Sequence, residues 1–231
     1  WAPDNNEKFK TYSDDLGFDS QLTKGISLVS NYQIFDDIKI KSITSFSDVE
    51  LNHSYDGDWA NSEYWLAEHG FDPELEYYEY KFFDNNDRKR KTFTQELRTS
   101  IGSLVLGAYL KNLKEEDKAS GYLYGGLATD SESMYDFISR ATYAQYEFML
   151  TKKLKLKANF RYEESDISYE SLSEDNYYYT PINEVKTRIK SSMVGYSSVF
   201  NYSMNESINY YAFISRGYKA GGVNQEPNLS E

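Results

Sequence analysis

Aromatic residues gather in the polar stretch 52–91, and two shorter aromatic groups follow further along the chain. Tyr and Trp rings stack on planar ligands such as a metal chelate or a sugar ring, and their polar tips donate hydrogen bonds. The sequence predicts ligand-binding loops at these places; the alternative is that the rings pack the loops against one another. The candidate contact residues are Trp59, Tyr64, Trp65, Tyr77, Tyr78, Tyr122, Tyr124, Tyr177 and Tyr178.

Other chemistry-bearing residues form no complete motif. Asp56 and Asp58 flank a glycine, and carboxylate oxygens at that spacing suit Ca²⁺, but the remaining ligands of a calcium loop do not follow. His53 and His69 are the only histidines, and two ligands do not complete a metal site. The sequence holds no G-x-S-x-G element and no phosphate loop. We therefore expect no catalytic residues, no bound metal and no cofactor.

Composition limits the function classes. The 231 residues carry a net charge of −12, which argues against nucleic-acid binding. Mean hydropathy is −0.73, and no run approaches the roughly 20 apolar residues of a membrane helix. A transmembrane β-barrel remains compatible with these values, because only alternate residues of its strands need be apolar.

The segment 154–162 alternates between two kinds of side chain, which predicts a strand with two unlike faces. One face carries Leu154, Leu156, Ala158, Phe160 and Tyr162. The other carries Lys155, Lys157, Asn159 and Arg161. The apolar face is predicted to meet lipid and the polar face a wet lumen, where the charges form ion-pair ladders between strands.

Strands of this kind recur in pairs joined by short polar turns. The predicted pairs are 25–35 with 38–51, 92–101 with 104–113, 137–150 with 154–165, and 187–202 with 207–218. The other connections, 52–91, 114–136, 166–186 and 219–231, are expected to be long loops. Short turns at one end only are typical of a membrane barrel with short periplasmic turns and long extracellular loops. The predicted fold is therefore an all-β, antiparallel, up-and-down portion of a transmembrane β-barrel with about eight strands.

Aromatic residues near strand ends are expected to form two girdles at the membrane surfaces. Phe200, Tyr202 and Tyr210 lie near a short turn, and Tyr109 and Tyr162 lie towards the long loops. The alternative is a soluble β-sheet in which Tyr and Phe serve only as good strand formers.

Four segments carry a resemblance to a known family. They are KSITSFSDVE (41–50), FTQELRTSIGSLVLGAYL (93–110), LKLKANFRYEESD (154–166) and NYYAFISRGYKAGGVN (209–224). Together they resemble the barrel domain of TonB-dependent outer-membrane receptors, in the order found in that family. One departure lies at 158–159, where Ala-Asn stands in place of a pattern that commonly contains glycine.

The resemblance implies a barrel of about 22 strands that surrounds an N-terminal plug domain. Residues 1–231 are then expected to be a partial barrel domain, an internal fragment without the plug and the C-terminal strands. The polar opening WAPDNNEKFK is not a signal peptide, which agrees with a piece of a longer chain. A complete eight-stranded barrel is the alternative.

The resemblance also implies a function. Such receptors sit in the outer membrane of Gram-negative bacteria, contact lipid and lipopolysaccharide, and bind a scarce bulky nutrient, here most simply a ferric siderophore or similar iron complex. TonB, reached through the plug region, supplies the energy for import. The alternative function is a soluble or surface carbohydrate-binding β-domain.

Overall fold

The computed structural model describes residues 12–77, 79–124, 126–175 and 180–223. Within them the chain forms eight β-strands and two short helices. In chain order these are β1 (Phe18–Phe35), β2 (Ile38–Asp56), α1 (Ser62–His69), α2 (Pro73–Glu76), β3 (Phe82–Ile101), β4 (Leu104–Leu123), β5 (Gly126–Met149), β6 (Leu154–Asp175), β7 (Thr180–Ser203) and β8 (Asn209–Arg216). Neither helix in these described segments is long and apolar enough to span a bilayer.

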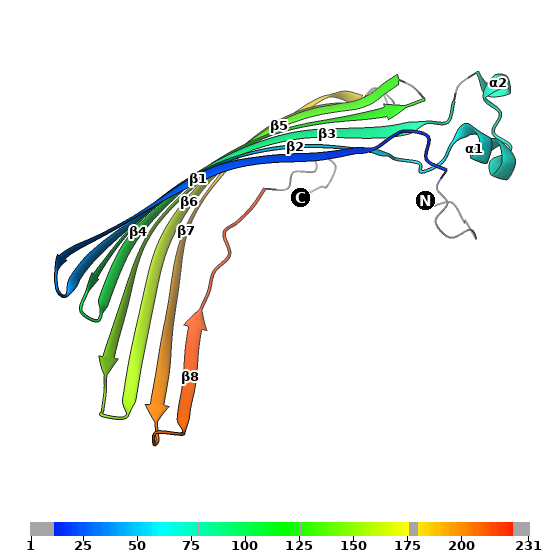
Figure 1. Ribbon diagram of the computed structural model, residues 1–231. Coiled ribbons are helices and arrows are strands. Elements are labelled where there is room, and N and C mark those ends of the chain that lie inside the picture. The colour runs from blue at the N-terminus through cyan, green and yellow to red at the C-terminus, as the bar shows by residue number, and fades with distance from the viewer. Residues whose placement is uncertain (1–11, 78, 125, 176–179, 224–231) are drawn as a thin grey trace.

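All eight strands belong to one antiparallel sheet, and each strand pairs with its neighbours in the sequence, in the order β1 to β8. The turns at one end are short: Asp36-Asp37 joins β1 to β2, and Gly102-Ser103 joins β3 to β4. Gly102 has a φ of +54°, a value that suits a tight hairpin turn. The predicted all-β, up-and-down fold is confirmed. Figure 1 shows the sheet bent into an arc, with residues 217–223 running inside it.

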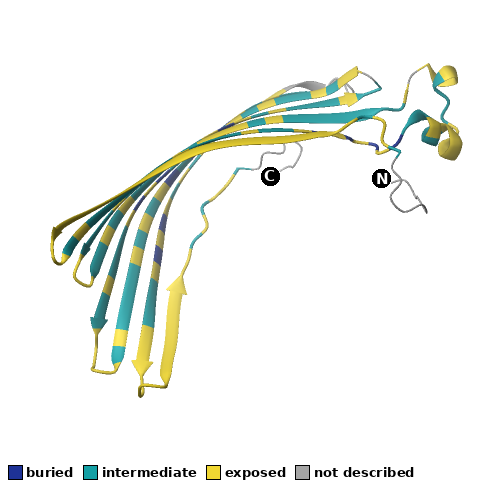
Figure 2. Cartoon of the chain, viewed as in Figure 1, coloured by how far each residue is buried: buried dark blue, intermediate teal, exposed yellow. Residues whose placement is uncertain are grey.

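The two faces of the sheet differ, as the alternation in 154–162 predicts. On β6, Arg161 hydrogen-bonds to Tyr218, which follows β8 inside the arc, so Arg161 lies on the concave face. Phe160 and Tyr162 therefore lie on the convex face, and Phe160 is registered with Tyr196 of β7. Figure 2 shows the resulting alternation of exposed and less exposed residues along the strands.

An apolar band runs across the convex face next to the short turns. Its members include Ile40, Leu97, Leu106, Ala144, Leu156, Phe160, Tyr196 and Phe200. We call this set, with the convex residues between its members, the outer apolar band. Since convex side chains have no second layer over them, this band suits contact with hydrocarbon.

The upper limit of the outer apolar band moves steadily towards the short turns from β3 to β8. Phe93 is its last apolar residue on β3, but on β4 it ends at Leu110, which is registered with Gln95, two residues below Phe93. On β6 the band ends at Tyr162, and on β8 it ends at Ile214. Ile214 is registered through Ser198 of β7 with Ala158 of β6, which lies four residues nearer the short turns than Tyr162. A stepped limit is what strands tilted by about 35–45° to a membrane plane produce.

The predicted long loops 114–136 and 166–186 are wrong. β4 and β5 continue as paired strands to Leu123 and Gly126, and β6 and β7 likewise continue well beyond the outer apolar band. The convex face of these extensions is mainly polar, whereas Ile167 and Tyr169 are buried on the concave face. The apolar residues are therefore too few to mark these extensions as lipid-facing strands in the sequence, although the backbone ladder persists. Cross-strand ion pairs such as Lys118–Glu132 accompany the extension.

The predicted loop 52–91 is shorter in the structure, because β2 and β3 take up both of its ends and leave residues 57–81. The placement of Tyr109 in an aromatic girdle is also wrong. Tyr109 is registered with Glu96, and the Arg161 guanidinium lies 5.6 Å from its ring centroid, so it lies on the concave face. Tyr162 does lie on the convex face, at the upper limit of the outer apolar band.

Opposite faces of β6 should respond differently to a buried charge. We expect Ala158→Arg, on the convex face, to destabilise the protein folded in phospholipid vesicles by about 2–4 kcal/mol, because it places a cation in hydrocarbon. Asn159→Arg, one residue along and on the concave face, is the matched control and should cost much less. Urea unfolding of both variants checks this, and equal losses would contradict the assignment of the faces.

Candidate functional site

Two capped helices shape the connection 57–81 at the end of the sheet opposite the short turns (Figure 1). The Asn61 side chain caps α1 by accepting the Tyr64 backbone N–H at 2.8 Å, and Gly70 ends the helix with a φ of 69°. Asp72 caps α2, which begins with Pro73. These local signals stop the chain from continuing as strand and fix Tyr64 and Trp65 in the first turn of α1.

Aromatic rings from this connection and from two strand ends pack into one cluster. The Trp65 ring centroid lies 4.3 Å from that of Tyr80 and 5.7 Å from that of Tyr64. Tyr80 in turn contacts Phe82 at 5.0 Å and Tyr124 at 5.8 Å between centroids. We call this set the rim aromatic cluster; its members are Tyr64, Trp65, His69, Phe71, Tyr80, Phe82 and Tyr124. Three of the predicted contact residues, Tyr64, Trp65 and Tyr124, therefore come together.

The other predicted contact residues lie elsewhere. Trp59 is 48% exposed and Tyr77 is 93% exposed, so both rings are open to solvent beside the cluster. Tyr122 packs against Phe83 with 6.3 Å between ring centroids, on the convex side of the β3–β4 hairpin. Tyr78, Tyr177 and Tyr178 lie outside the residues that the structure describes.

A pair of buried carboxyl groups holds the first part of this connection. Asp56 accepts hydrogen bonds from the backbone N–H groups of Asp58 and Trp59, and the Trp65 indole N–H donates to Asp58 at 3.1 Å. Burial, followed by the hydrogen bond with the Asp56 carboxyl, raises the pKa of Asp58 to about 7. The Asp-Gly-Asp step thus links β2 to the rim aromatic cluster.

The histidines do not meet. His53 lies on β2 beside Tyr55, whereas His69 ends α1 against Trp65. Within the described segments, no three His, Asp or Glu side chains gather in a way that suits a metal ion.

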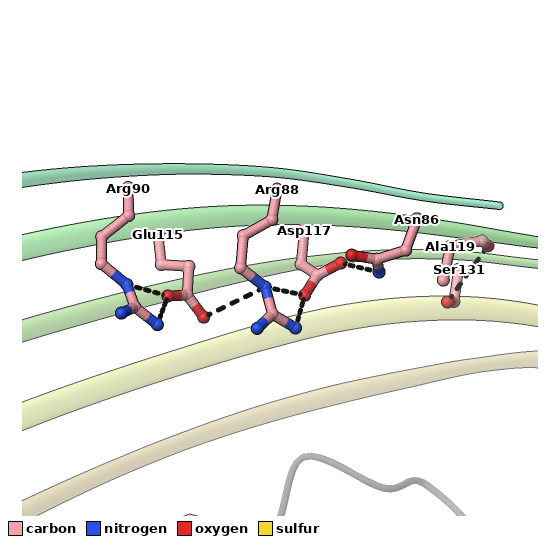
Figure 3. A network of polar contacts seen from close by, with 7 residues as sticks. All are labelled: Asn86, Arg88, Arg90, Glu115, Asp117, Ala119 and Ser131. Atoms are coloured by element: carbon pink, nitrogen blue, oxygen red, sulfur yellow. Dashed lines mark hydrogen bonds and ion pairs between the residues drawn. The ribbon is translucent and has the colours of Figure 1, made fainter. Parts of the chain in front are cut away.

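Below the rim aromatic cluster, the concave face of β3 and β4 carries a ladder of charged pairs (Figure 3). Arg90 forms an ion pair with Glu115, Arg88 pairs with Asp117, and the Asn86 amide donates to Asp117 at 2.5 Å. We call these five residues the arginine ladder. The side chains of Glu115 and Arg90 are 8% and 46% exposed, respectively, so the acids are sunk into the wall while the guanidinium groups remain accessible. Such guanidinium groups can still bind an anion from the concave side.

Nearer the short turns, a second polar network on the concave face joins residues of β3, β5 and β6 with Tyr218, which follows β8. Arg98 donates to Glu96 at 2.6 Å, and the Tyr143 hydroxyl donates to the same carboxylate. Arg161 pairs with Glu163 at 2.9 Å, and the Tyr218 hydroxyl donates to Glu163 at 2.7 Å. We call these residues the lower polar network; a cavity of about 640 Å³ adjoins Arg98, Arg161, Tyr143 and Tyr218.

Sequence analysis placed Arg161 on the polar face of its strand but named neither Tyr143 nor Tyr218. Two glycines were the available signal. The ring of Tyr143 lies so close to Gly107 that a Cβ there would come within 2.1 Å of it, and a Cβ at Gly195 would come within 2.8 Å of Tyr218. Glycine inside a strand often marks close approach of another group. Here the approaching groups are the rings of Tyr143 and Tyr218, each of which lies over a glycine of another strand.

The fold of this chain matches solved structures, whereas its sequence matches no known family. No protein-family model matches the sequence, and no curated protein matches it either. Among solved structures, the ferric yersiniabactin uptake receptor FyuA of Yersinia pestis superposes with a TM-score of 0.74 at 16% identity, over 91% of this chain and 30% of the receptor. The two share a fold.

A second structure shows the same likeness more loosely. The open form of the ferric-catecholate import receptor Fiu of E. coli K12 superposes with a TM-score of 0.54 at 13% identity, over 88% of this chain and 36% of the receptor. Its closed form gives the same TM-score at 15% identity, over 88% of this chain and 34% of that one. The chain thus spans about a third of the length of the receptors that it matches.

The raised pKa of Asp58 predicts that the packing of Trp65 in the rim aromatic cluster depends on pH. A carboxyl whose pKa is raised on folding stabilises the fold fully below its ordinary value near 3.8, and this contribution is lost as the pH rises through about 7. We expect acrylamide quenching of Trp65 to increase between pH 5 and 8. Asp58→Asn keeps an acceptor for the Trp65 indole N–H and should make the quenching independent of pH. Trp65→Phe identifies the reporter, and a persistent transition in Asp58→Asn would contradict the assignment.

Close approach at Gly107 predicts a steric effect. Gly107→Ala should displace the Tyr143 ring and break its hydrogen bonds with Glu96 and Arg98, at a cost of about 1–3 kcal/mol. Gly25→Ala is the control, since a Cβ there meets only ordinary contacts at 3.5 Å or more. Urea midpoints of the folded protein measure both. Equal midpoints for the two variants would show that Tyr143 does not depend on Gly107.

Proposed function

We propose that this chain forms part of the wall and extracellular rim of a receptor in the outer membrane of a Gram-negative bacterium. The receptor binds a ferric siderophore or a similar iron complex and imports it with energy transmitted by TonB. The observation that carries the proposal is the superposition of this sheet on FyuA over 91% of the chain, with an apolar convex face and a polar concave face. An apolar outer band argues against the soluble carbohydrate-binding alternative, because it would leave large apolar side chains in water.

The proposed barrel extends beyond this sheet. β1 is exposed along its whole length and β8 along all of its residues, so both form free edges of the described sheet. A strand edge in hydrocarbon leaves backbone N–H and C=O groups unpaired, which is why membrane barrels are closed. In the proposal, further strands pair with both edges, and a plug domain that contacts TonB fills the concave side.

The proposed path of the iron complex runs along the concave face. It begins at the rim aromatic cluster with the exposed rings of Trp59 and Tyr77 beside it. Tyr78, Tyr177 and Tyr178 remain candidate contacts from the sequence, whereas Tyr122 faces away from this path. The path continues past Arg88 and Arg90, whose accessible guanidinium groups suit the anionic oxygens of a ferric chelate. Aromatic stacking followed by charge recognition suits a flat, anionic ligand.

Neutralising one step of the arginine ladder tests the proposal. The double variant Arg90→Gln/Glu115→Gln removes both charges together, so that no buried acid is left unpaired. We expect its affinity for ferric siderophores to fall about tenfold, since one charge-assisted contact is worth roughly 1.5–3 kcal/mol. Quenching of tryptophan fluorescence by ferric catecholate and ferric hydroxamate complexes measures the affinity.

Lys91→Gln is the matched control, because Lys91 follows Arg90 on β3 and faces the convex side. It should bind the ferric complexes as the unmodified protein does. If no ferric complex binds while oligosaccharides do, the carbohydrate-binding alternative replaces the proposal.

A further inference from the structure

The chain leaves β8 early and turns onto the concave face. β8 has 8 residues, whereas its partner β7 has 24, and the two strands pair only along residues 196–203 of β7. Residues 217–223, which we call the inner strap, then run inside the arc of the sheet (Figure 1). Within the described residues, the stretch 180–195 of β7 therefore has no strand beside it on the β8 side.

The point at which the strap leaves the sheet coincides with the upper limit of the outer apolar band. On β8 this limit is Ile214, and the ladder ends two residues later at Arg216. Unpaired backbone N–H and C=O groups are costly in hydrocarbon, but beyond it they can bond to water. The edge of β7 above this point can thus stay open, and it also remains able to pair with a strand.

Tyr218 anchors the inner strap to the lower polar network. Its hydroxyl donates to Glu163 at 2.7 Å and accepts a hydrogen bond from Arg161 at 2.9 Å. Its ring lies over Gly195 of β7, where an added Cβ would come within 2.8 Å of it. The first turn of the strap away from β8 is therefore fixed by one side chain.

A second contact lies further along the strap. A Cβ added at Gly221 would lie 3.8 Å from the side chains of Ile189 and Ser191 of β7. Met193, which lies between this contact and the Tyr218 ring on the concave face of β7, is only 8% exposed. The strap thus covers a stretch of wall that would otherwise face the lumen.

Outside these two contacts the strap is loosely packed. A Cβ added at Gly217 or Gly222 would meet no atom within 4 Å, and the cavity of about 640 Å³ adjoins Gly217 and Tyr218. None of the three strap glycines, Gly217, Gly221 and Gly222, has a positive φ. The strap therefore has room to move, and it can become a strand without leaving a conformation that only glycine adopts.

The inner strap spans the wall between the two polar sites of the concave face. Its Tyr218 end lies at the row of Arg161, in the lower polar network. Its Gly221 end approaches the row of Thr92, which is two residues along β3 from Arg90 of the arginine ladder. The strap therefore lies across the proposed path of the iron complex.

The same residues can instead continue β8. The register of β8 with β7, extended upwards, pairs Gly221 with Ser191, which Gly221 already approaches, so the strap is at the required height. Because side chains alternate along a strand, Tyr218 would then move to the convex face beside Val194. Lys219 would face the concave side, where it adds a cation to the path.

We propose that the inner strap is a gate with two positions. In the docked position, seen here, it lies across the path, and Tyr218 is bound to Arg161 and Glu163. In the paired position it continues β8 along the open edge of β7, so the path widens, and Arg161 and Lys219 become available to an anionic iron complex. Such a ligand binds the paired position more tightly and shifts the equilibrium towards it. The inference rests on the proposed function for the ligand that drives this shift.

Engineered cysteine pairs report each position, because the chain contains no cysteine of its own. Ile189→Cys/Gly221→Cys reports the docked position, in which these residues are in contact. In the paired position their Cα atoms would lie about 8 Å apart, which is too far for a disulfide. Ser192→Cys/Ala220→Cys reports the paired position, in which the two residues lie directly opposite each other on the convex face. In the docked position the sheet separates them.

Oxidation of the receptor that carries this chain, reconstituted in phospholipid vesicles, gives the rate of each cross-link. Without ligand, the docked cross-link should form faster. Tyr218→Phe keeps the ring but removes its hydrogen bonds to charged groups, and it should raise the rate of the paired cross-link about tenfold. A saturating ferric catecholate complex should raise that rate as well. Tyr211→Phe is the matched control, because Tyr211 of β8 is 80% exposed, and it should leave both rates unchanged.

Two results would overturn the gate. One is a paired cross-link that stays absent both in Tyr218→Phe and with the ferric complex. The other is an equal effect of Tyr211→Phe, which would remove the role of Tyr218 as the catch. Uptake of ferric complexes by cells is a second readout: oxidised Ile189→Cys/Gly221→Cys should block it, and a reductant should restore it. Uptake at the unmodified rate by the oxidised form would also overturn the gate.

Binding of ferric complexes separates the two proposals. Absence of such binding in every form, with Tyr218→Phe still raising the rate of the paired cross-link, would overturn the transport proposal and support the two positions of the strap. Retained binding of ferric complexes, together with a strap that never pairs with β7, would overturn the gate alone.

Discussion

The continuous antiparallel ladder is the constraint on which the rest of this structure depends. Every strand pairs with its sequence neighbours without a crossover, so one register assigns each side chain of eight strands to the convex or the concave face. A slip of one residue between β6 and β7 would carry Phe160 inward and Arg161 outward. The chemistry of both faces is therefore a consequence of the register, and not of any single contact.

This division gives the two faces of one sheet different side-chain chemistry. The convex face changes from apolar to charged side chains at a limit that steps down from Phe93 to Ile214, as tilted strands require. The concave face combines buried apolar side chains such as Ile167 and Tyr169 with paired charges: Arg90 with Glu115 near the rim, and Arg161 with Glu163 lower down. Pairing allows charges to be half-buried in a wall without the cost of an isolated ion.

The rim differs from the wall in the forces that hold it. Residues 57–81 leave the ladder, and helix caps, stacked rings and two buried carboxyl groups take its place. Tyr64 packs against Trp65, and Tyr124 packs against Tyr80. The rings of Trp59 and Tyr77, in contrast, stay open to solvent. Packing and exposure are thus divided among aromatic residues that look equivalent in the sequence.

Alternation in the sequence was enough to determine the fold class, the short turns and the two faces of segments such as 154–162, because side-chain period is a local property of a strand. It failed at 114–136 and 166–186, where polar side chains dominate the convex face although pairing continues. It also misplaced Tyr109, because Leu110 beside it is apolar too, so the sequence does not show which of the two faces outward. Only the tertiary structure decided that Tyr143 lies over Gly107 and that Tyr218 reaches Glu163. Those contacts join residues far apart in the chain, and the register and curvature of the whole sheet, which no local pattern encodes, bring them together.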